Sequence, residues 1–147
     1  MIRQATLEDT ARIAEIEIFN YRINFYPIFQ SDVYYFQELQ VPNLMKQYQE
    51  NEELLQRTYV YDDGVVKGFI RIQGQQVEKL FVEPVLQNQK IGARLLRFAI
   101  EEKNASYLWA LEKNQKAIAF YKQHGFQVTL DRMLEEGTTE YLVRLER

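Results

Sequence analysis

Few side chains in this protein of 147 residues can do covalent or metal chemistry. It has no cysteine and a single histidine, His124. Disulfides, thiolate metal sites and a cysteine nucleophile are therefore excluded, and so is a metal site built on two histidines. Any chemistry must rest on carboxylates, tyrosines, backbone amides or a bound cofactor, and we expect no metal site.

One segment has the pattern of an anion site. Val82-Glu83-Pro84 ends an apolar stretch, and a polar turn then leads to Ile91-Gly92-Ala93-Arg94, where helical spacing begins. A helix start presents unpaired amides and the positive end of the dipole, which suits phosphate. The small residues at 92 and 93 admit an anion, and Lys90 and Arg94 add positive charge. Taken alone, the segment is equally well explained as an ordinary strand-to-helix turn with a solvated basic surface.

A second motif lies at 111–126, and its Asn114 follows Gln87 by 27 residues. Its sequence is LEKNQKAIAFYKQHGF, which places Asn114, Ala117 and Tyr121 at fixed spacing before a Gly-Phe pair. Together the two segments resemble the acetyl-coenzyme A binding motifs of the GNAT superfamily of N-acetyltransferases. The second one matches the family pattern Asn-x-x-Ala-x-x-x-Tyr-x-x-x-Gly-Phe at every position.

The first segment follows the family pattern with one departure. That pattern is Gln/Arg-x-x-Gly-x-Gly/Ala after a Val-x-Pro strand end, and Gln87, Gly92 and Val82-Glu83-Pro84 match it. Lys90 stands where the family usually has glycine. If position 90 is left-handed, a residue other than glycine costs roughly 1–2 kcal/mol.

The resemblance implies acetyl-CoA as cosubstrate. The pantetheine arm would lie between strands 77–82 and 108–111 and pair with the first of them by strand addition. The pyrophosphate would sit on the amides of the loop before the second-half helix. The resemblance thus implies the following cofactor-binding residues: Leu80, Phe81, Val82, Gln87, Asn88, Gln89, Lys90, Ile91, Gly92, Ala93, Asn114 and Tyr121.

Two residues are candidates for catalysis. The resemblance implies that the Tyr121 phenol protonates the leaving thiolate, since its pKa near 10 is close enough to that of a thiol. The alternative for Tyr121 is a core tyrosine on the apolar face made by Ala117 and Ile118. Glu78 is the candidate base that deprotonates the amine, with a solvent-facing strand carboxylate as an equal alternative.

Eight aromatic residues gather between Phe19 and Phe36, in a region (1–57) with 9 acidic and 5 basic side chains. In this family that region forms the acceptor site, so we expect a cationic amine there, although these rings could also be plain core. The predicted substrate-binding residues are Tyr21, Tyr26, Phe29 and Trp109. Trp109 stands where family members that acetylate protein N-termini often have glutamate, which argues against that acceptor.

The function that follows is acetyl transfer from acetyl-CoA to a small cationic amine by direct attack in a ternary complex. A peptide or protein lysine is the alternative acceptor. A non-catalytic coenzyme A sensor and an interaction module that uses the aromatic surface are the rivals from other classes.

Hydrophobic period and turn residues predict the elements that must position these groups. The order is β-α-α-β-β-β-α-β-α-β-β, an α/β domain of the GNAT type with a mixed central sheet of about seven strands and four flanking helices. The first helix is predicted over 8–20 and a second over 31–50, interrupted near Pro42. The other helices begin at residues 91 and 114, and strands are predicted at 2–5, 58–62, 65–73, 77–82, 108–111, 126–130 and 140–145.

Composition sets the remaining expectations. Hydrophobic residues make up 46% and charged residues 27% of the sequence, as in an ordinary globular domain, and the length fits one domain over 1–147. No apolar run reaches the ~18 residues of a membrane span, and the first residues lack the apolar core of a signal peptide. We therefore expect a cytoplasmic protein that binds no membrane. The net charge of −3 argues against nucleic acid as a partner, and the resemblance implies that a homodimer can form.

Overall fold

The computed structural model describes residues 1–147 and confirms the α/β fold with a seven-stranded sheet in the order β1-β2-β3-β4-β5-β7-β6. Only β4 and β5 are parallel, and every other neighbouring pair is antiparallel. The strands are β1 (Ile2–Gln4), β2 (Thr58–Asp62), β3 (Val66–Gln73), β4 (Gln76–Val82), β5 (Tyr107–Leu111), β6 (Gln127–Leu134) and β7 (Tyr141–Glu146). The helices are α1 (Thr10–Asn20), α2 (Tyr26–Phe29), α3 (Val41–Glu50), α4 (Glu52–Gln56), α5 (Ile91–Lys103) and α6 (Gln115–Gln123).

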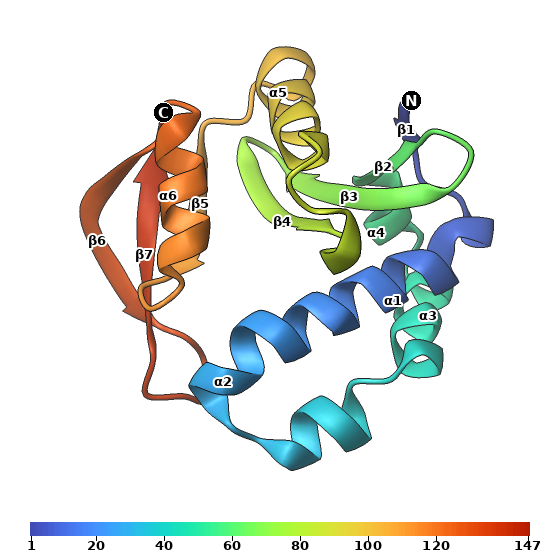
Figure 1. Ribbon diagram of the computed structural model, residues 1–147, viewed down its shortest axis with the longest axis horizontal. Coiled ribbons are helices and arrows are strands. Elements are labelled where there is room, and N and C mark those ends of the chain that lie inside the picture. Colours follow the sequence, from blue (N-terminus) through green and yellow to red (C-terminus); the bar gives the residue numbers. More distant parts are fainter.

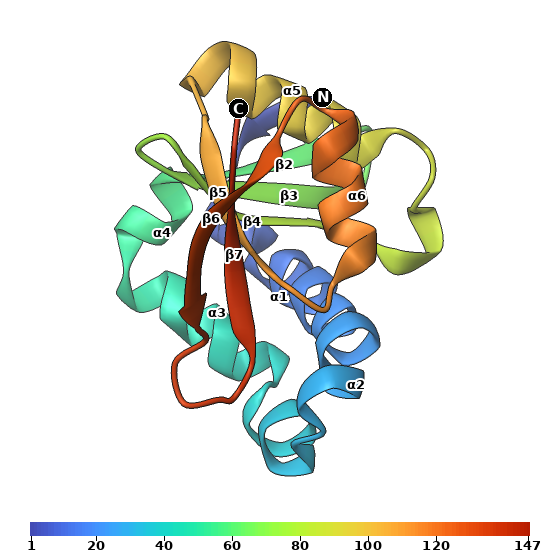
Figure 2. The same ribbon diagram turned by 90° about the vertical axis from the view of Figure 1, so that its left-hand side faces the viewer.

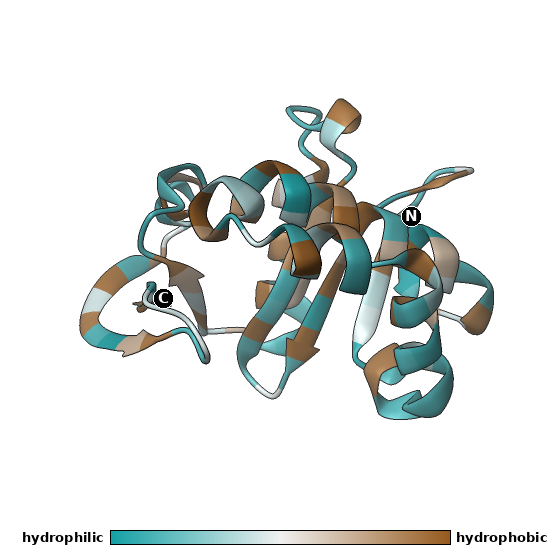
Figure 3. Cartoon of the chain, turned by 90° about the horizontal axis from the view of Figure 1, so that it is seen from below, coloured by the Kyte–Doolittle hydropathy of each residue, from teal (hydrophilic) through white to brown (hydrophobic).

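Helices cover both faces of the first four strands. On one face, Ile13 and Ile16 of α1 join Phe69 of β3 in a buried cluster. On the other face, Leu95 and Leu96 of α5 belong to the largest cluster, together with side chains of β3, β5 and β7. Figures 1 and 2 show α5 on one side of the sheet and α1 with α3 on the opposite side. Figure 3 shows that the helices of the chain carry both hydrophobic and hydrophilic residues, as expected between core and solvent.

The last three strands form the second half of the sheet. β5 pairs with β7, which pairs with the edge strand β6, and α6 packs beside them (Figure 1). Strand β6 is longer than predicted, because it continues to Leu134. Its register to β7 shifts between Val128 and Arg132, and Leu130 there is fully exposed. A strand without a buried face gives no alternating pattern, so its end could not be found from periodicity.

The first predicted helix ends at Asn20, as expected for α1, but the backbone remains helical beyond it. A π-helical turn, Tyr21–Phe25, joins α1 to α2, which ends at a left-handed Gln30. π-Turns often occur at functional sites. This one turns the aromatic side chains of Tyr21 and Phe25 toward β4, where both rings contact Phe81.

The prediction of one interrupted helix over 31–50 was wrong. A π-helical turn, Tyr34–Glu38, ends before an extended Gln40, and α3 then begins at Val41. Pro42 lies in the first turn of α3, so it starts this helix rather than interrupting one. The missing N–H of proline would have had no partner in a first turn. The short α4 follows as a separate helix.

Candidate functional site

β4 and β5 run parallel but remain paired over a short stretch only. Gln76 pairs with Tyr107 and Val77 with Leu108, and no pair follows. Beyond this point the strands part, and the space between them is a cavity of about 1060 Å³. The predicted opening between these strands is therefore present, and residues of the segment 20–29 line its other side.

The edge of β4 that faces this opening carries unpaired backbone groups. The N–H of Glu83 donates to the C=O of Lys67, at 2.9 Å, so these two residues form a hydrogen-bonded pair of the antiparallel ladder. Because such pairs alternate along a ladder, Phe81 is also directed toward β3, whereas Leu80 and Val82 are directed away from it. The C=O of Val82 accepts from the side-chain amide of Asn20 at 2.9 Å. The N–H groups of Leu80 and Val82 and the C=O of Leu80 remain available to a ligand.

An irregularity in β4 coincides with the point where the strands part. Its register to β3 shifts at Arg71, which leaves Glu78 as an extra residue in β4. The Glu78 carboxylate accepts from Arg57 at 2.7 Å and from Arg71 at 2.9 Å. Burial would raise the pKa of Glu78, but the bonds and charges of the two arginines outweigh it and lower that pKa. Glu78 lines the cavity as a paired anion, which makes it a weak base.

The predicted phosphate loop lies at the start of α5. Asn88 and Lys90 both have left-handed backbones, with φ of 69° and 66°. The left-handed conformation expected for position 90 is thus confirmed, and Lys90 adopts it without being glycine. A Cβ atom added to Gly92 would lie 3.5 Å from Phe120 and 3.6 Å from Val82, which are ordinary contacts. Packing alone therefore does not require glycine at position 92.

The two basic residues expected beside the loop do not lie together. Lys90 lines the cavity. Arg94, however, donates to the hydroxyl of Tyr61 at 2.7 Å and does not line the cavity, so its predicted place beside the anion was wrong. Lys90 is the left-handed N-cap of α5, whereas Arg94 lies inside the helix and its side chain reaches Tyr61 of β2. Lys116 of α6 reaches this loop, where its ammonium donates to the Oε1 atom of Gln87 at 3.3 Å.

The second motif forms the start and one face of α6. Asn114 caps the helix by accepting from the N–H of Ala117 at 3.3 Å, and Gly125, with φ of 91°, follows the helix end as predicted. Tyr121 lines the cavity, and burial raises the pKa of its phenol. The phenol is therefore protonated throughout the physiological pH range. The Nδ1 atom of His124 lies 2.9 Å from the C=O of Phe120, at the helix end expected for this residue.

Most of the predicted aromatic residues lie at the cavity. Tyr21, Phe29 and Trp109 line it, and burial raises the pKa of Tyr21 well above its ordinary value. Tyr26 does not line it. Its hydroxyl donates to Asp32 at 2.6 Å, and its ring packs on Tyr35 and on Phe36. Tyr26 lies three residues before Phe29 in α2, but its ring packs against the segment that follows α2 and not into the cavity. Among the predicted cofactor residues, Gln89 alone is absent from the lining.

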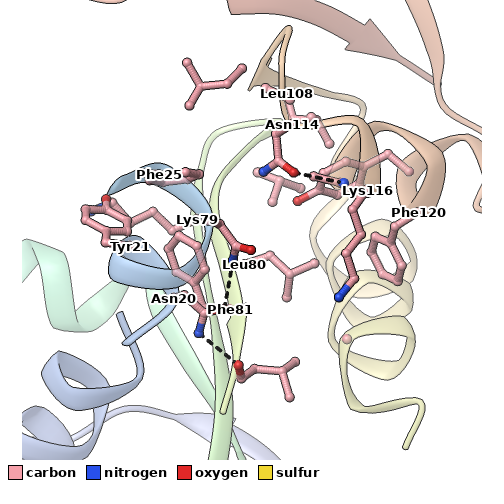
Figure 4. A pocket seen from close by; sticks show the side chains of 18 of the residues that line it. Asn20, Tyr21, Phe25, Lys79, Leu80, Phe81, Leu108, Asn114, Lys116 and Phe120 are labelled. Atoms are coloured by element: carbon pink, nitrogen blue, oxygen red, sulfur yellow. Dashed lines mark hydrogen bonds between the residues drawn. The ribbon is translucent and has the colours of Figure 1, made fainter. Parts of the chain in front are cut away.

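Several residues of the site were not found from the sequence. Asn20 is 2% exposed and joins α1 to β4 and to Gln87, whose side-chain N–H donates to it at 3.3 Å. Lys79 lies over the ring of Tyr21 and donates at 2.7 Å to Glu17, whose side chain is only 6% exposed. Figure 4 shows Asn20, Tyr21 and Lys79 on one side of the pocket, with Asn114, Lys116 and Phe120 on the other. The sequence did contain one signal for part of this group, because Glu17 and Asn20 are polar residues within the apolar stripe of α1.

The loop between β6 and β7 supplies the remaining wall. Residues 135–138 line the cavity together with Ser31 and Tyr34, which follow α2. Burial raises the pKa of Tyr34, and the charge of Glu135 adds to that rise across the cavity. These segments lie far apart in the sequence, and both line the same cavity. Their meeting could not be predicted without the topology of the sheet.

A parallel strand pair that opens beside a helix N-terminus defines a class of α/β ligand-binding domain. The family model described as an acetyltransferase (GNAT) domain matches residues 55–128, which are 74 of the 147 residues. The chain therefore belongs to this family, as its motifs predicted. The match includes the phosphate loop and Tyr121 but ends before the β6–β7 loop and begins after the aromatic segment 19–36.

Relatives with curated names are similar over about half of the sequence. The peptidyl-lysine N-acetyltransferase YjaB of Salmonella typhimurium is 33% identical over 70 residues, 48% of each protein. The peptidyl-lysine N-acetyltransferase YiaC of Escherichia coli is 32% identical over 68 residues, 46% of the present sequence and 47% of that protein. The chain thus spans about half the length of the curated relatives that it matches.

Solved structures match over nearly the whole sequence and establish the fold. An N-acetyltransferase from Staphylococcus aureus Mu50 has a TM-score of 0.79 at 16% identity, and the match covers 99% of the present protein and 98% of that one. The PaiA N-acetyltransferase of Thermoplasma acidophilum, solved in complex with coenzyme A, has a TM-score of 0.71 at 19% identity, with 100% and 98% covered. No helix of the present structure combines the length and the apolar character needed to cross a membrane.

Proposed function

We propose that this protein is an N-acetyltransferase that moves the acetyl group of acetyl-CoA to a primary amine. One observation carries the proposal: the opening of β4 from β5 lies beside the helix N-terminus of α5, in a single cavity. Family membership supports it, as do related folds solved with coenzyme A or acetyl-CoA.

The residues present fit such a cosubstrate. The unpaired backbone groups of Leu80 and Val82 match the amides of a pantetheine arm, which can add to β4 as an extra strand. The amides from Asn88 to Gly92 suit a pyrophosphate, since they lie at the positive end of α5. The eleven predicted cofactor residues that line the cavity remain candidates on this basis, whereas Gln89 does not line it.

The bound acetyl-CoA would supply an activated acetyl group and a thiolate as leaving group. The Leu80 N–H can donate to the thioester oxygen, which gains negative charge as the amine attacks. Tyr121 is the proton donor to the thiolate. Its burial favours this role, because the phenol stays protonated and because a thiolate in the same apolar surroundings also becomes more basic.

The amine must lose a proton before it attacks, and the contacts of Glu78 bear on the route. Both arginines hold Glu78 as an anion, which favours a positioning role at the irregularity in β4 over the role of base. We infer that the ammonium loses its proton to water in the cavity, and that the paired Glu78 holds the strand in its open form.

The acceptor is proposed to be a primary amine on an alkyl group. Aromatic rings of Tyr21, Phe25 and Phe29 suit such a group, and a positive amine is attracted to Glu135 and Glu136 at the rim. A small cationic amine fits this wall. A peptide lysine is the second candidate, and one observation favours it: curated relatives are named peptidyl-lysine N-acetyltransferases.

Two measurements, made one after the other, test the proposal. Thermal unfolding with acetyl-CoA comes first, since a ligand that binds only the folded state raises the midpoint. No shift at millimolar acetyl-CoA would favour the interaction module. Thiol release from acetyl-CoA is then measured with a panel of amines, polyamines and lysine peptides. Binding without release of thiol for any amine would instead support a coenzyme A sensor.

A further inference from the structure

A hydrogen-bonded series of side chains crosses the cofactor end of the cavity. The ammonium of Lys116, on α6, donates to the Oε1 atom of Gln87 at 3.3 Å. The side-chain N–H of Gln87 donates to Asn20 at 3.3 Å, and Asn20 donates to the C=O of Val82 at 2.9 Å. All four residues line the cavity, so this series joins α6, the phosphate loop, α1 and β4 around one space.

Lys116 is the member of this series with unused bonding capacity. An ammonium has three N–H donors, and the Gln87 contact uses one. The residue is exposed, so the remaining donors face the cavity or solvent. In Figure 4, Lys116 extends from the start of α6 toward the open space of the pocket.

The charge balance of the phosphate loop also points to Lys116. Arg94 is engaged with Tyr61 on another side of α5, which leaves Lys90 as the loop's own cation at the cavity. A pyrophosphate has more than one negative charge. Lys116 of α6 reaches the same loop at Gln87, so a diphosphate in the loop would have a second lysine beside it.

We propose that Lys116 is a phosphate-binding residue, whose ammonium leaves the Oε1 atom of Gln87 and donates to the pyrophosphate of the bound cosubstrate. This inference rests on the proposed function and adds a residue outside the loop to it. A phosphate oxygen is a better acceptor than a neutral amide, because both charges strengthen the bond. Gln87 keeps its bond to Asn20 and holds the loop in place.

The test measures acetyl-CoA binding by calorimetry to the full-length protein and to Lys116→Gln. We expect about five-fold weaker binding of the variant, as for an exposed charge pair of about 1 kcal/mol, and a smaller ratio at high salt. Lys122→Gln is the matched control, because Lys122 lies exposed on the same helix and does not line the cavity. It should bind acetyl-CoA as the wild type does.

Shortened ligands identify the group that Lys116 contacts. The effect of Lys116→Gln should persist with 3′-dephospho-acetyl-CoA, which keeps the pyrophosphate, and vanish with acetyl-pantetheine, which has no phosphate. Loss of the effect with the dephospho ligand would assign the contact to the 3′-phosphate and overturn the proposal. An equal effect with acetyl-pantetheine would overturn it too.

A double variant separates phosphate binding from support of the loop. If Lys116 acts only through Gln87, then Lys116→Gln has no effect in a Gln87→Ala background, and the proposal fails. A direct contact predicts that the five-fold loss remains there. Wild-type protein that does not bind acetyl-CoA at all would contradict the proposed function itself, whereas binding that is indifferent to Lys116 contradicts only this inference.

Discussion

The two ends of the cavity, which we propose bind the cofactor and the acceptor, are formed by different parts of the chain. At the cofactor end, backbone groups of Leu80 and Val82 and the small residues around Gly92 form the surface. At the proposed acceptor end, aromatic side chains of the π-helical turn and α2 form it together with polar side chains of the β6–β7 loop. A surface made of backbone depends on how strands and helices are placed. A surface made of side chains depends on which residues occupy it.

This difference explains how far the sequence could be read. Motifs identify the cofactor end, because a parting strand, a helix start and a capped helix require particular residues at particular spacings. The acceptor end has no such constraint, and the family match does not include residues 19–36. Each variant below therefore tests whether one end can be changed without the other.

The largest effect is expected for Tyr121→Phe. Loss of the phenol proton should lower kcat about a hundred-fold, as for other general acids. The affinity for acetyl-CoA should stay unchanged, because the ring still packs between Phe120 and Phe126. Steady-state kinetics and calorimetry check both numbers. Tyr141→Phe, outside the cavity, is the control, and an unaltered kcat in Tyr121→Phe would remove the acid role.

Two glycine variants should separate binding from folding. Gly92→Ala should weaken acetyl-CoA binding about ten-fold and leave the urea midpoint unchanged or higher, since the new methyl group has room in the free protein. Gly68→Ala should instead lower the free energy of unfolding by about 1–3 kcal/mol. Its Cβ would lie 3.0 Å from the C=O of Phe81 and 3.2 Å from Leu95. Equal losses of stability in both variants would contradict this division.

At the acceptor end, two aromatic residues of α2 form a matched pair. Phe29→Ala should raise KM for the amine about five-fold, the equivalent of about 1 kcal/mol, and leave KM for acetyl-CoA alone. Tyr26→Ala should change neither, although both rings pack on the same small cluster and both variants should lose stability. If Tyr26→Ala raised the amine KM as strongly, the assignment of this wall would be wrong.

The smallest effect is expected for Glu78→Gln, followed against pH. The pKa of Glu78 is lower in the folded protein than in the unfolded state. Its stabilising contribution is therefore complete above the unfolded value near 4.3 and is lost as the pH falls below it. Urea unfolding measures the free energy of unfolding at pH 7 and at pH 4. Its decrease between these two pH values should be smaller for Glu78→Gln than for wild type. A positioning role also predicts that the pH profile of kcat/KM keeps its acidic limb in this variant. If Glu78 were the base, its replacement would remove that limb.

Sequence reasoning reached most of the sheet and the cofactor end. Alternation, turns and the two motifs placed the seven strands, α5, α6 and Tyr121. It missed what depends on neighbours distant in the sequence, such as Asn20 on Val82, Lys116 on Gln87, and Arg94 turned to Tyr61. It also placed Tyr26 at the cavity, because the contacts of its ring with Tyr35 and Phe36 cannot be found from helical period.

Amide hydrogen exchange followed by NMR tests the central claim most directly. If β4 offers its open edge to acetyl-CoA, saturating ligand should slow exchange at the N–H groups of Leu80 and Val82. The N–H of Phe81 should exchange slowly with and without ligand, because its ladder partner is Phe69. Alternating protection at 80 and 82 is the predicted result. Exchange at Leu80 and Val82 that stays unchanged at saturation would contradict the account, because the cosubstrate would then lie elsewhere.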